Sequence, residues 1–253
     1  MYINGVSIFF ATRWHTLMTQ AKRNPNALPI YVQIAELLIR DIAAGRLIDG
    51  ERLPPEREMA ADLNVSVTTL RKSLAELENK GMLERIQGSG NYVRDTGTEA
   101  SVYAMFRLEL PGGGGLPRAD ILSVDVMQKP DELPDFGASN RGSRVRRIRY
   151  LNDTIIAVEE IWLDESAGVI DRALLSDSLY RYYQRQLGFW ITRAEDRVSI
   201  ATLPGWTPPT FSKPAGFTVG YIERFSWSDR AEPVEFSKTW FDPEQAIYVQ
   251  RLK

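Results

Sequence analysis

The sequence predicts an α+β protein in which a small helical domain precedes a domain built mostly of antiparallel strands. Apolar residues recur at helical spacing over residues 30–80, whereas beyond residue 101 they alternate or form short strand-like runs. A stretch of small and polar residues, 96–101, separates the two patterns and is typical of a linker. The chain has 253 residues, which is enough for two such domains.

Composition excludes several kinds of site. The chain has no cysteine, which excludes disulfides and cysteine-based chemistry and favours a reducing cytoplasm. Its one histidine, His15, excludes a histidine triad or a multi-histidine metal site. No apolar run approaches the roughly 20 residues that span a bilayer, so no membrane partner is expected. No cofactor is expected either. Because the formal net charge is −2, any binding to nucleic acid must depend on local geometry.

The first 28 residues are predicted to be a disordered tail. They show no sustained periodicity and include a turn-prone Asn-Pro-Asn run at 24–26. Both Met1 and Met18 are candidate start residues. The apolar stretch at 6–11 is short and lacks the flanks of a signal peptide.

Residues 29–95 are predicted to form three helices and a hairpin. In order, the helices cover 30–42, 55–63 and 67–80, and apolar segments at 82–86 and 92–93 follow. Ser66 is a good N-cap for the third helix, and a glycine-rich turn at 87–91 joins the two apolar segments into a β-hairpin. Helix, turn, helix and hairpin in this order form a winged helix-turn-helix.

The last helix of such a unit presents its N-terminal side chains to the major groove of DNA. The candidate DNA-binding residues are Arg57, Ser66, Val67, Thr68, Thr69, Arg71, Gly88, Ser89 and Gly90. Hydroxyl groups and arginines suit phosphates and base edges, and glycines allow close backbone approach. Each feature also has a simpler interpretation, in which the serine only caps its helix, the glycines only form a turn, and the arginines only pair with Glu58 or Glu76. Their joint order favours DNA binding.

Four blocks of this segment resemble the GntR family of bacterial repressors. They are LPPEREMA at 53–60, VSVTTLRK at 65–72, LENKGML at 77–83 and GSGNYV at 88–93. The resemblance implies double-stranded operator DNA as the partner. It further implies that Arg57, Thr68, Thr69 and Arg71 contact this DNA and that Gly88 to Gly90 form the wing tip.

Val67 departs from the family pattern, because many members have arginine at this base-reading position. Its side chain could contact a thymine methyl group, so a different operator preference is expected. The charge of residues 29–95 is near balance, which predicts modest affinity for a single domain. We therefore expect a homodimer that places two recognition helices on a palindromic operator.

The C-terminal residues 102–253 are predicted to form mainly strands. The expected elements are strands at 102–110, 121–127, 144–151, 155–163, 189–203, 217–227 and 233–241 and a helix at 177–187. This part resembles the UTRA ligand-sensing domain of HutC-type GntR regulators, through residues 147–151, 157–159, 178–180 and 234–238. The resemblance implies an antiparallel sheet related to the chorismate lyase fold and a pocket for a small, usually anionic effector.

The candidate effector-binding residues are Arg147, Arg149, Glu159, Ser178, Tyr180 and Glu235. Residues 147 and 149 share one strand face. A three-residue loop at 152–154 would place Arg147 opposite Glu159, and Arg149 opposite Ala157 on the same face, whereas a two-residue loop would break this register. Two arginines beside one carboxylate suit a phosphate or carboxylate ligand. The alternative is a cross-strand ion pair worth roughly 0–1 kcal/mol.

Together these features predict a ligand-responsive transcriptional regulator. The leading hypothesis is a repressor that leaves a palindromic operator when a sugar phosphate or carboxylate binds. One alternative is an operator-binding protein without a working effector site. The other is a lyase-like enzyme in which Glu159 and Glu235 perform acid-base chemistry. The attached winged helix argues against an enzyme.

Overall fold

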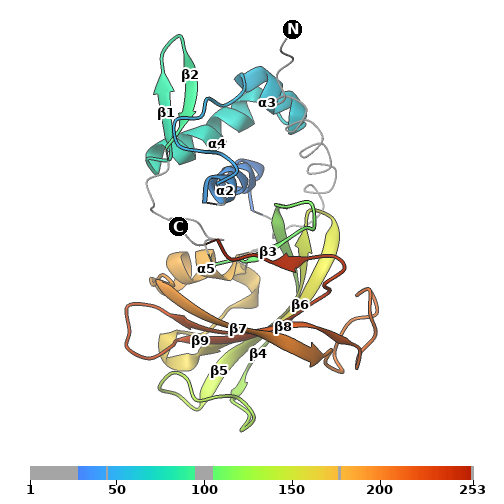
Figure 1. Ribbon diagram of the computed structural model, residues 1–253. Helices are drawn as coiled ribbons and strands as arrows, with labels where there is room; N and C mark the ends of the chain where they lie inside the picture. The colour runs from blue at the N-terminus through green and yellow to red at the C-terminus, as the bar shows by residue number, and fades with distance from the viewer. Residues whose placement is uncertain (1–27, 44, 95–104, 176–177, 252–253) are drawn as a thin grey trace. The chain divides into compact units, whose positions relative to one another are not determined.

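The computed structural model describes residues 28–43, 45–94, 105–175 and 178–251. The predicted linker, 96–101, and most of the predicted tail lie outside this part of the chain. Leu28, assigned to the tail, is buried and accepts a hydrogen bond from the side chain of Gln33. The described elements divide into two compact units, one with α2 to β2 and one with β3 to β10 (Figure 1).

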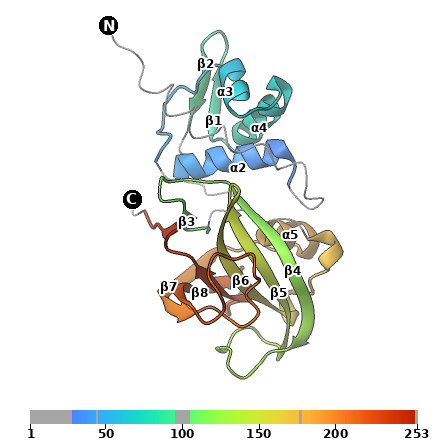
Figure 2. The same cartoon turned by 90° about the vertical axis from the view of Figure 1, so that its right-hand side faces the viewer.

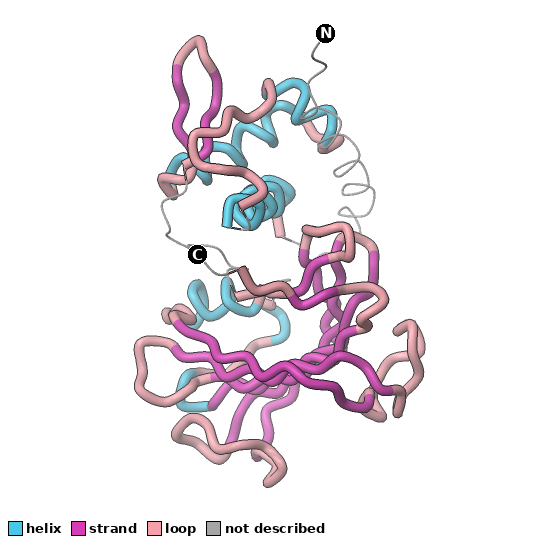
Figure 3. Tube along the Cα trace, in the orientation of Figure 1, coloured by secondary structure: helices cyan, strands magenta, loops and turns pink. Residues whose placement is uncertain are grey.

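The first unit contains three helices and a hairpin, as the sequence predicts. Its elements are α2 (Ile30–Ala43), α3 (Glu56–Asp62), α4 (Val67–Asn79), β1 (Leu83–Ile86) and β2 (Gly90–Val93). The two strands are antiparallel, and Ile86 pairs with Gly90 across the turn. The hairpin projects away from the helices of this unit (Figure 3). This is the arrangement of a winged helix-turn-helix.

The apolar stripes of the three helices meet in one core. Leu38 of α2, Met59 of α3 and Leu70 and Leu74 of α4 are each 0% exposed. These positions recur at helical spacing, so α3 and α4 each bury one face and expose the other, whereas residues 33–42 of α2 are all buried. The packing brings Arg71 of α4 next to Glu56 at the start of α3.

The second unit is built on a six-stranded antiparallel sheet with the order β4-β5-β6-β9-β8-β7. The strands are β4 (Pro117–Gln128), β5 (Arg141–Leu151), β6 (Thr154–Asp164), β7 (Arg193–Thr202), β8 (Thr218–Trp227) and β9 (Glu235–Phe241). Two short 3-10 turns, η1 (Glu165–Ala167) and η2 (Arg172–Leu174), follow β6. A separate ladder joins β3 (Leu108–Glu109) to β10 (Ile247–Tyr248).

One face of the six-stranded sheet is covered by α5 (Leu179–Tyr182) and the π-helical turn η3 (Tyr183–Leu187) (Figure 2). Tyr183 packs there with Val145 of β5 and Ile161 of β6. The next residues along these strands face the other way, and Trp162 packs with Phe236 of β9 on the opposite face. The alternation follows from the two-residue repeat of a strand.

Two predicted elements differ from the structure. The expected strand at 102–110 is a strand only at Leu108–Glu109 within its described residues. The expected helix at 177–187 is α-helical for one turn and then widens into η3, which ends at Gly188 with a φ of 75°. The apolar pattern gives the position of this helix but does not distinguish α from π hydrogen bonding.

Candidate functional site

The start of α4 is fixed by a side-chain cap. The Ser66 hydroxyl accepts a hydrogen bond from the backbone N–H of Thr69 at 3.1 Å, and the two hydroxyl oxygens are 2.8 Å apart. Ser66 is therefore the N-cap that the sequence predicts, and its hydroxyl is already engaged with Thr69. Thr68 lies between them and is exposed.

Arg71 joins α4 to α3 through an exposed ion pair. Its Nε lies 2.6 Å from Oε2 of Glu56, rather than beside Glu76, the partner that the sequence suggested. Exposed pairs of this kind contribute little to stability, about 0–1 kcal/mol. The guanidinium of Arg71 can therefore leave the glutamate for a phosphate at small cost.

Arg57 and the hairpin tip complete the predicted DNA-facing set. Arg57 is exposed in the first turn of α3, and within the described residues it forms no ion pair, with Glu58 or any other residue. At the tip, Gly88 has a φ of 74°, and the hydroxyls of Ser89 and Tyr92 are 2.6 Å apart. Val67 is half-buried against the apolar core, so only part of its side chain is accessible.

The second site depends on the pairing of β5 with β6. The loop between them has two residues, Asn152 and Asp153, and Leu151 pairs with Thr154. A bulge then shifts the register, because Tyr150 pairs with Ile155 and Arg149 with Ala157. The extra residue on β6 restores the register that a three-residue loop would give.

The bulge brings two arginines to one carboxylate. Arg147 pairs with Glu159 across the strands, and its Nε lies 2.5 Å from Oε2 of the glutamate. The Nε of Arg149 is 3.7 Å from the same oxygen. Thr239 of β9 donates a hydrogen bond to the other oxygen of Glu159 at 3.3 Å. All three charged side chains are buried, and Arg149 is 2% exposed.

Glu235 is the centre of a second buried group. Tyr183 donates a hydrogen bond to one of its oxygens at 2.6 Å, and Ser226 of β8 donates to the other at 2.8 Å. The Tyr180 hydroxyl lies 3.4 Å from the oxygen that Ser226 binds. Ser178 caps α5 by accepting a hydrogen bond from the backbone N–H of Arg181 at 3.3 Å. Its placement thus sets the position of Tyr180.

Sequence reasoning missed several residues of this face, among them Ser226 and Thr239 described above. Tyr183 contacts Glu235, as described above, and Arg224 of β8 forms two hydrogen bonds with Asp196 of β7 at 2.5 and 2.7 Å. Asp196 also accepts a hydrogen bond from Tyr248 at 2.8 Å. The signal available in the sequence was the alternation along β8, which places Arg224 and Ser226 on one face.

The two glutamates have opposite pKa shifts. Burial favours the neutral form of Glu159, but the positive charges of Arg147 and Arg149 outweigh burial and lower its pKa. Burial also raises the pKa of Glu235, and hydrogen bonds from Tyr183 and Ser226 offset only part of that effect. The site thus combines a carboxylate held charged with one shifted toward its neutral form.

The raised pKa of Glu235 predicts a pH dependence of stability. The folded protein holds this proton more tightly than the unfolded chain, where the pKa is the ordinary 4.5. The resulting stabilisation is complete below pH 4.5 and is lost as pH rises through the folded-state pKa. Urea unfolding at several pH values should therefore show a smaller loss of stability with rising pH for Glu235→Gln than for the wild type. Equal slopes for the two proteins would contradict the assignment.

Within the described residues, no group of three or more histidine, cysteine, aspartate or glutamate side chains could hold a metal ion. No helix in the same part of the chain is long and apolar enough to cross a membrane. The second unit contains a pair of buried guanidinium groups, Arg147 and Arg149, a type of group that can pair with an anion.

Comparison with known proteins assigns both units. Residues 30–93 match the family described as bacterial regulatory proteins, gntR family, and residues 113–246 match the UTRA domain. The chain is 51% identical to the HTH-type transcriptional regulator SmoD of Agrobacterium fabrum over 233 residues, which cover 92% of this chain and 100% of that protein. It is 26% identical to the HTH-type transcriptional repressor NagR of Bacillus subtilis over 237 residues, 91% of this chain and 97% of that protein.

A solved structure supports the fold of the second unit. The ligand-binding domain of a GntR-family transcriptional regulator from Bordetella bronchiseptica aligns with a TM-score of 0.50 at 19% identity. The alignment covers 58% of this chain and 96% of that domain. The matched families and the curated relatives are transcriptional regulators, and the hypothesis of a lyase-like enzyme is therefore wrong.

Proposed function

This chain belongs to the GntR family of bacterial regulatory proteins and is a transcriptional regulator with a DNA-binding helix-turn-helix unit and a ligand-binding UTRA domain, and we propose that it is a repressor released from its operator by a small anionic metabolite. Repression is supported by the name of the Bacillus subtilis relative. The proposed DNA contacts are made by Arg57, Ser66, Val67, Thr68, Thr69, Arg71, Gly88, Ser89 and Gly90.

The anionic effector is supported chiefly by the charge arrangement at Glu159. One carboxylate faces the two buried guanidinium groups of Arg147 and Arg149. The Nη1 atom of Arg147 is buried and has no hydrogen-bond partner among the residues that the structure describes. A buried donor left in this state costs about 1–3 kcal/mol, and a phosphate or carboxylate would satisfy it. Ser178, Tyr180 and Glu235 are the proposed polar neighbours of the bound molecule.

Release from DNA would follow from a population shift. A homodimer places two α4 helices on the two halves of a palindromic operator. An effector that binds more tightly to a dimer geometry mismatched to the half-site spacing favours that geometry. A coupling free energy of about 1–3 kcal/mol between the two ligands would change operator affinity by about 5-fold to 150-fold.

The proposal is tested by thermal unfolding with a panel of sugar phosphates, sugar acids and other small carboxylates, followed by operator binding with each compound that shifts the midpoint. A bound effector raises the midpoint by mass action. We expect Arg149→Ala to abolish the shift and Arg146→Ala to retain it, since Arg146 pairs with Glu160 on the other face of the strand. A compound that raises the midpoint without weakening operator binding would contradict release by effector.

Arg57 tests the DNA-binding part of the proposal. If its guanidinium contacts a base, Arg57→Ala should weaken operator binding by about 1–3 kcal/mol and relax specificity at one position of the operator. The measurement is the fluorescence anisotropy of labelled operator and of scrambled duplex, with Glu195→Gln as a control in the other unit. An equal loss on both duplexes would show that Arg57 does not read a base.

A further inference from the structure

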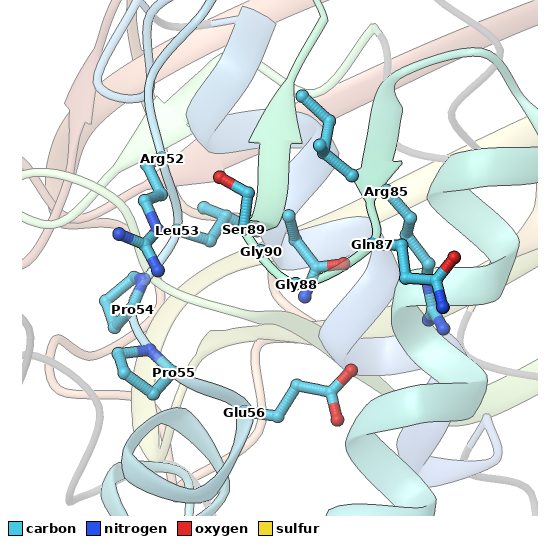
Figure 4. Close-up of a pocket in the computed structure, with 12 residues that line it drawn as sticks. Arg52, Leu53, Pro54, Pro55, Glu56, Arg85, Gln87, Gly88, Ser89 and Gly90 are labelled. Carbon is cyan, nitrogen blue, oxygen red and sulfur yellow. The ribbon is translucent and has the colours of Figure 1, made fainter.

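An open groove of about 580 Å³ lies between the hairpin tip and the chain that leads into α3 (Figure 4). One wall consists of Arg52, Pro54 and Pro55, and the hairpin residues 85–91 form the other. Glu56, at the start of α3, also lines the groove and holds Arg71 of α4. The groove therefore lies between the hairpin tip and the start of α3.

Among the described charged residues that line this groove, only Arg52 has no ion pair. Glu56 is paired with Arg71, and Arg85 lies 3.2 Å from the carboxylate of Glu78. Arg52 is exposed, and within the described part of the chain it has no ion pair. Its guanidinium lies along the hairpin at Gly90, where a Cβ atom would come within 3.0 Å of its Nε. The absence of a side chain at Gly90 thus lets the cation lie against the hairpin backbone.

The geometry of duplex DNA indicates what would occupy this groove. A sugar-phosphate strand separates the major groove from each adjacent minor groove. If the start of α4 enters a major groove and the hairpin tip approaches the neighbouring minor groove, the strand between them passes over the space between α4 and the tip. The groove beside Arg52 lies on the tip side of that space, because the hairpin residues 85–91 line it together with Glu56, which pairs with Arg71 of α4.

We propose that Arg52 is a DNA-contacting residue that binds a backbone phosphate in this groove. The inference rests on the proposed DNA-binding function and adds a contact outside the recognition residues named above. The phosphate contact fixes how the hairpin and α4 are set on the duplex and carries no sequence information. Glu56 carries a negative charge already paired with Arg71, so the exposed Arg52 is the favoured position for the phosphate.

The test uses the full-length protein, an operator duplex and a scrambled duplex, with affinities measured at several salt concentrations. Arg52→Gln should weaken binding to both duplexes by the same factor. It should also reduce the slope of log affinity against log salt by about one. Arg52→Lys should keep the wild-type slope. Arg94→Gln is the matched control, because Arg94 is an exposed arginine that follows β2 and pairs with Glu84, and its slope should not change.

The possible outcomes separate this inference from the proposed function. An unchanged slope for Arg52→Gln, with the unfolding midpoint of the wild type, would overturn the phosphate contact. A loss confined to the operator would also overturn it, since that pattern indicates base reading. A wild-type protein that binds both duplexes equally would contradict operator recognition. The phosphate contact would still be decided by comparing the salt slopes of Arg52→Gln and the wild type. Binding to neither duplex would overturn both.

Discussion

Replacing Glu159 with glutamine is expected to lower the free energy of unfolding by about 3–5 kcal/mol, the cost of removing one partner from a buried ion pair. Arg147 and Arg149 share this carboxylate and are almost fully buried. The glutamine can still accept a hydrogen bond from Arg147, but it supplies no charge. Two guanidinium groups then stay in a medium that solvates them poorly.

The measurement is urea unfolding at neutral pH, with Glu195→Gln as the control. Glu195 pairs with Arg197 on an exposed part of β7, where both side chains are more than half exposed, and its loss should cost about 0–1 kcal/mol. A second readout concerns anions. Inorganic phosphate should stabilise the Glu159 variant more than the wild type, because it can replace the missing charge. Equal small losses for the two variants would favour the cross-strand ion pair as the only role of this cluster.

The same cluster shows what the sequence could and could not predict. The spacing of Arg147 and Arg149 along a strand is enough to place them on one face. Their position opposite Glu159 required the correct cross-strand register, and the loop alone gives the wrong one. The two-residue turn, with Asn152 at a φ of 56°, is of the tight kind that hairpins favour, and the bulge on β6 then corrects the register. No local sequence signal marks that bulge.

The sequence also could not predict which residues of distant elements contact one another. Arg224 faces Asp196 because β7 pairs with β8 in a particular register, and Tyr183 reaches Glu235 because η3 packs on the sheet. Such contacts depend on tertiary structure rather than on spacing. The helices of the first unit were easier to predict, because their apolar stripes, the Ser66 cap and the glycine turns are all local features.

The first unit is small, so the loss of one buried core side chain should have a large effect on its stability. Leu74 is 0% exposed in the core between α2, α3 and α4, and Leu74→Ala should cost about 2–5 kcal/mol through lost burial and the cavity left behind. At about 0.05–0.15 kcal/mol per residue, a domain spanning residues 28–94 has about 3–10 kcal/mol of stability in total, and the substitution removes a large part of it. The variant should therefore lose most of its folded helix-turn-helix unit at physiological temperature.

Calorimetry and ligand binding together measure this result. If the two units fold independently, Leu74→Ala lowers one unfolding transition, and the transition of the sheet unit stays in place. Operator binding should fall more than tenfold, while any effector identified by the panel still binds. Asn79→Ala, at an exposed position near the end of the same helix, should change stability by less than about 0.5 kcal/mol. A single transition that shifts as a whole would instead mean that the two units unfold as one cooperative body, and effector binding would then be lost along with DNA binding.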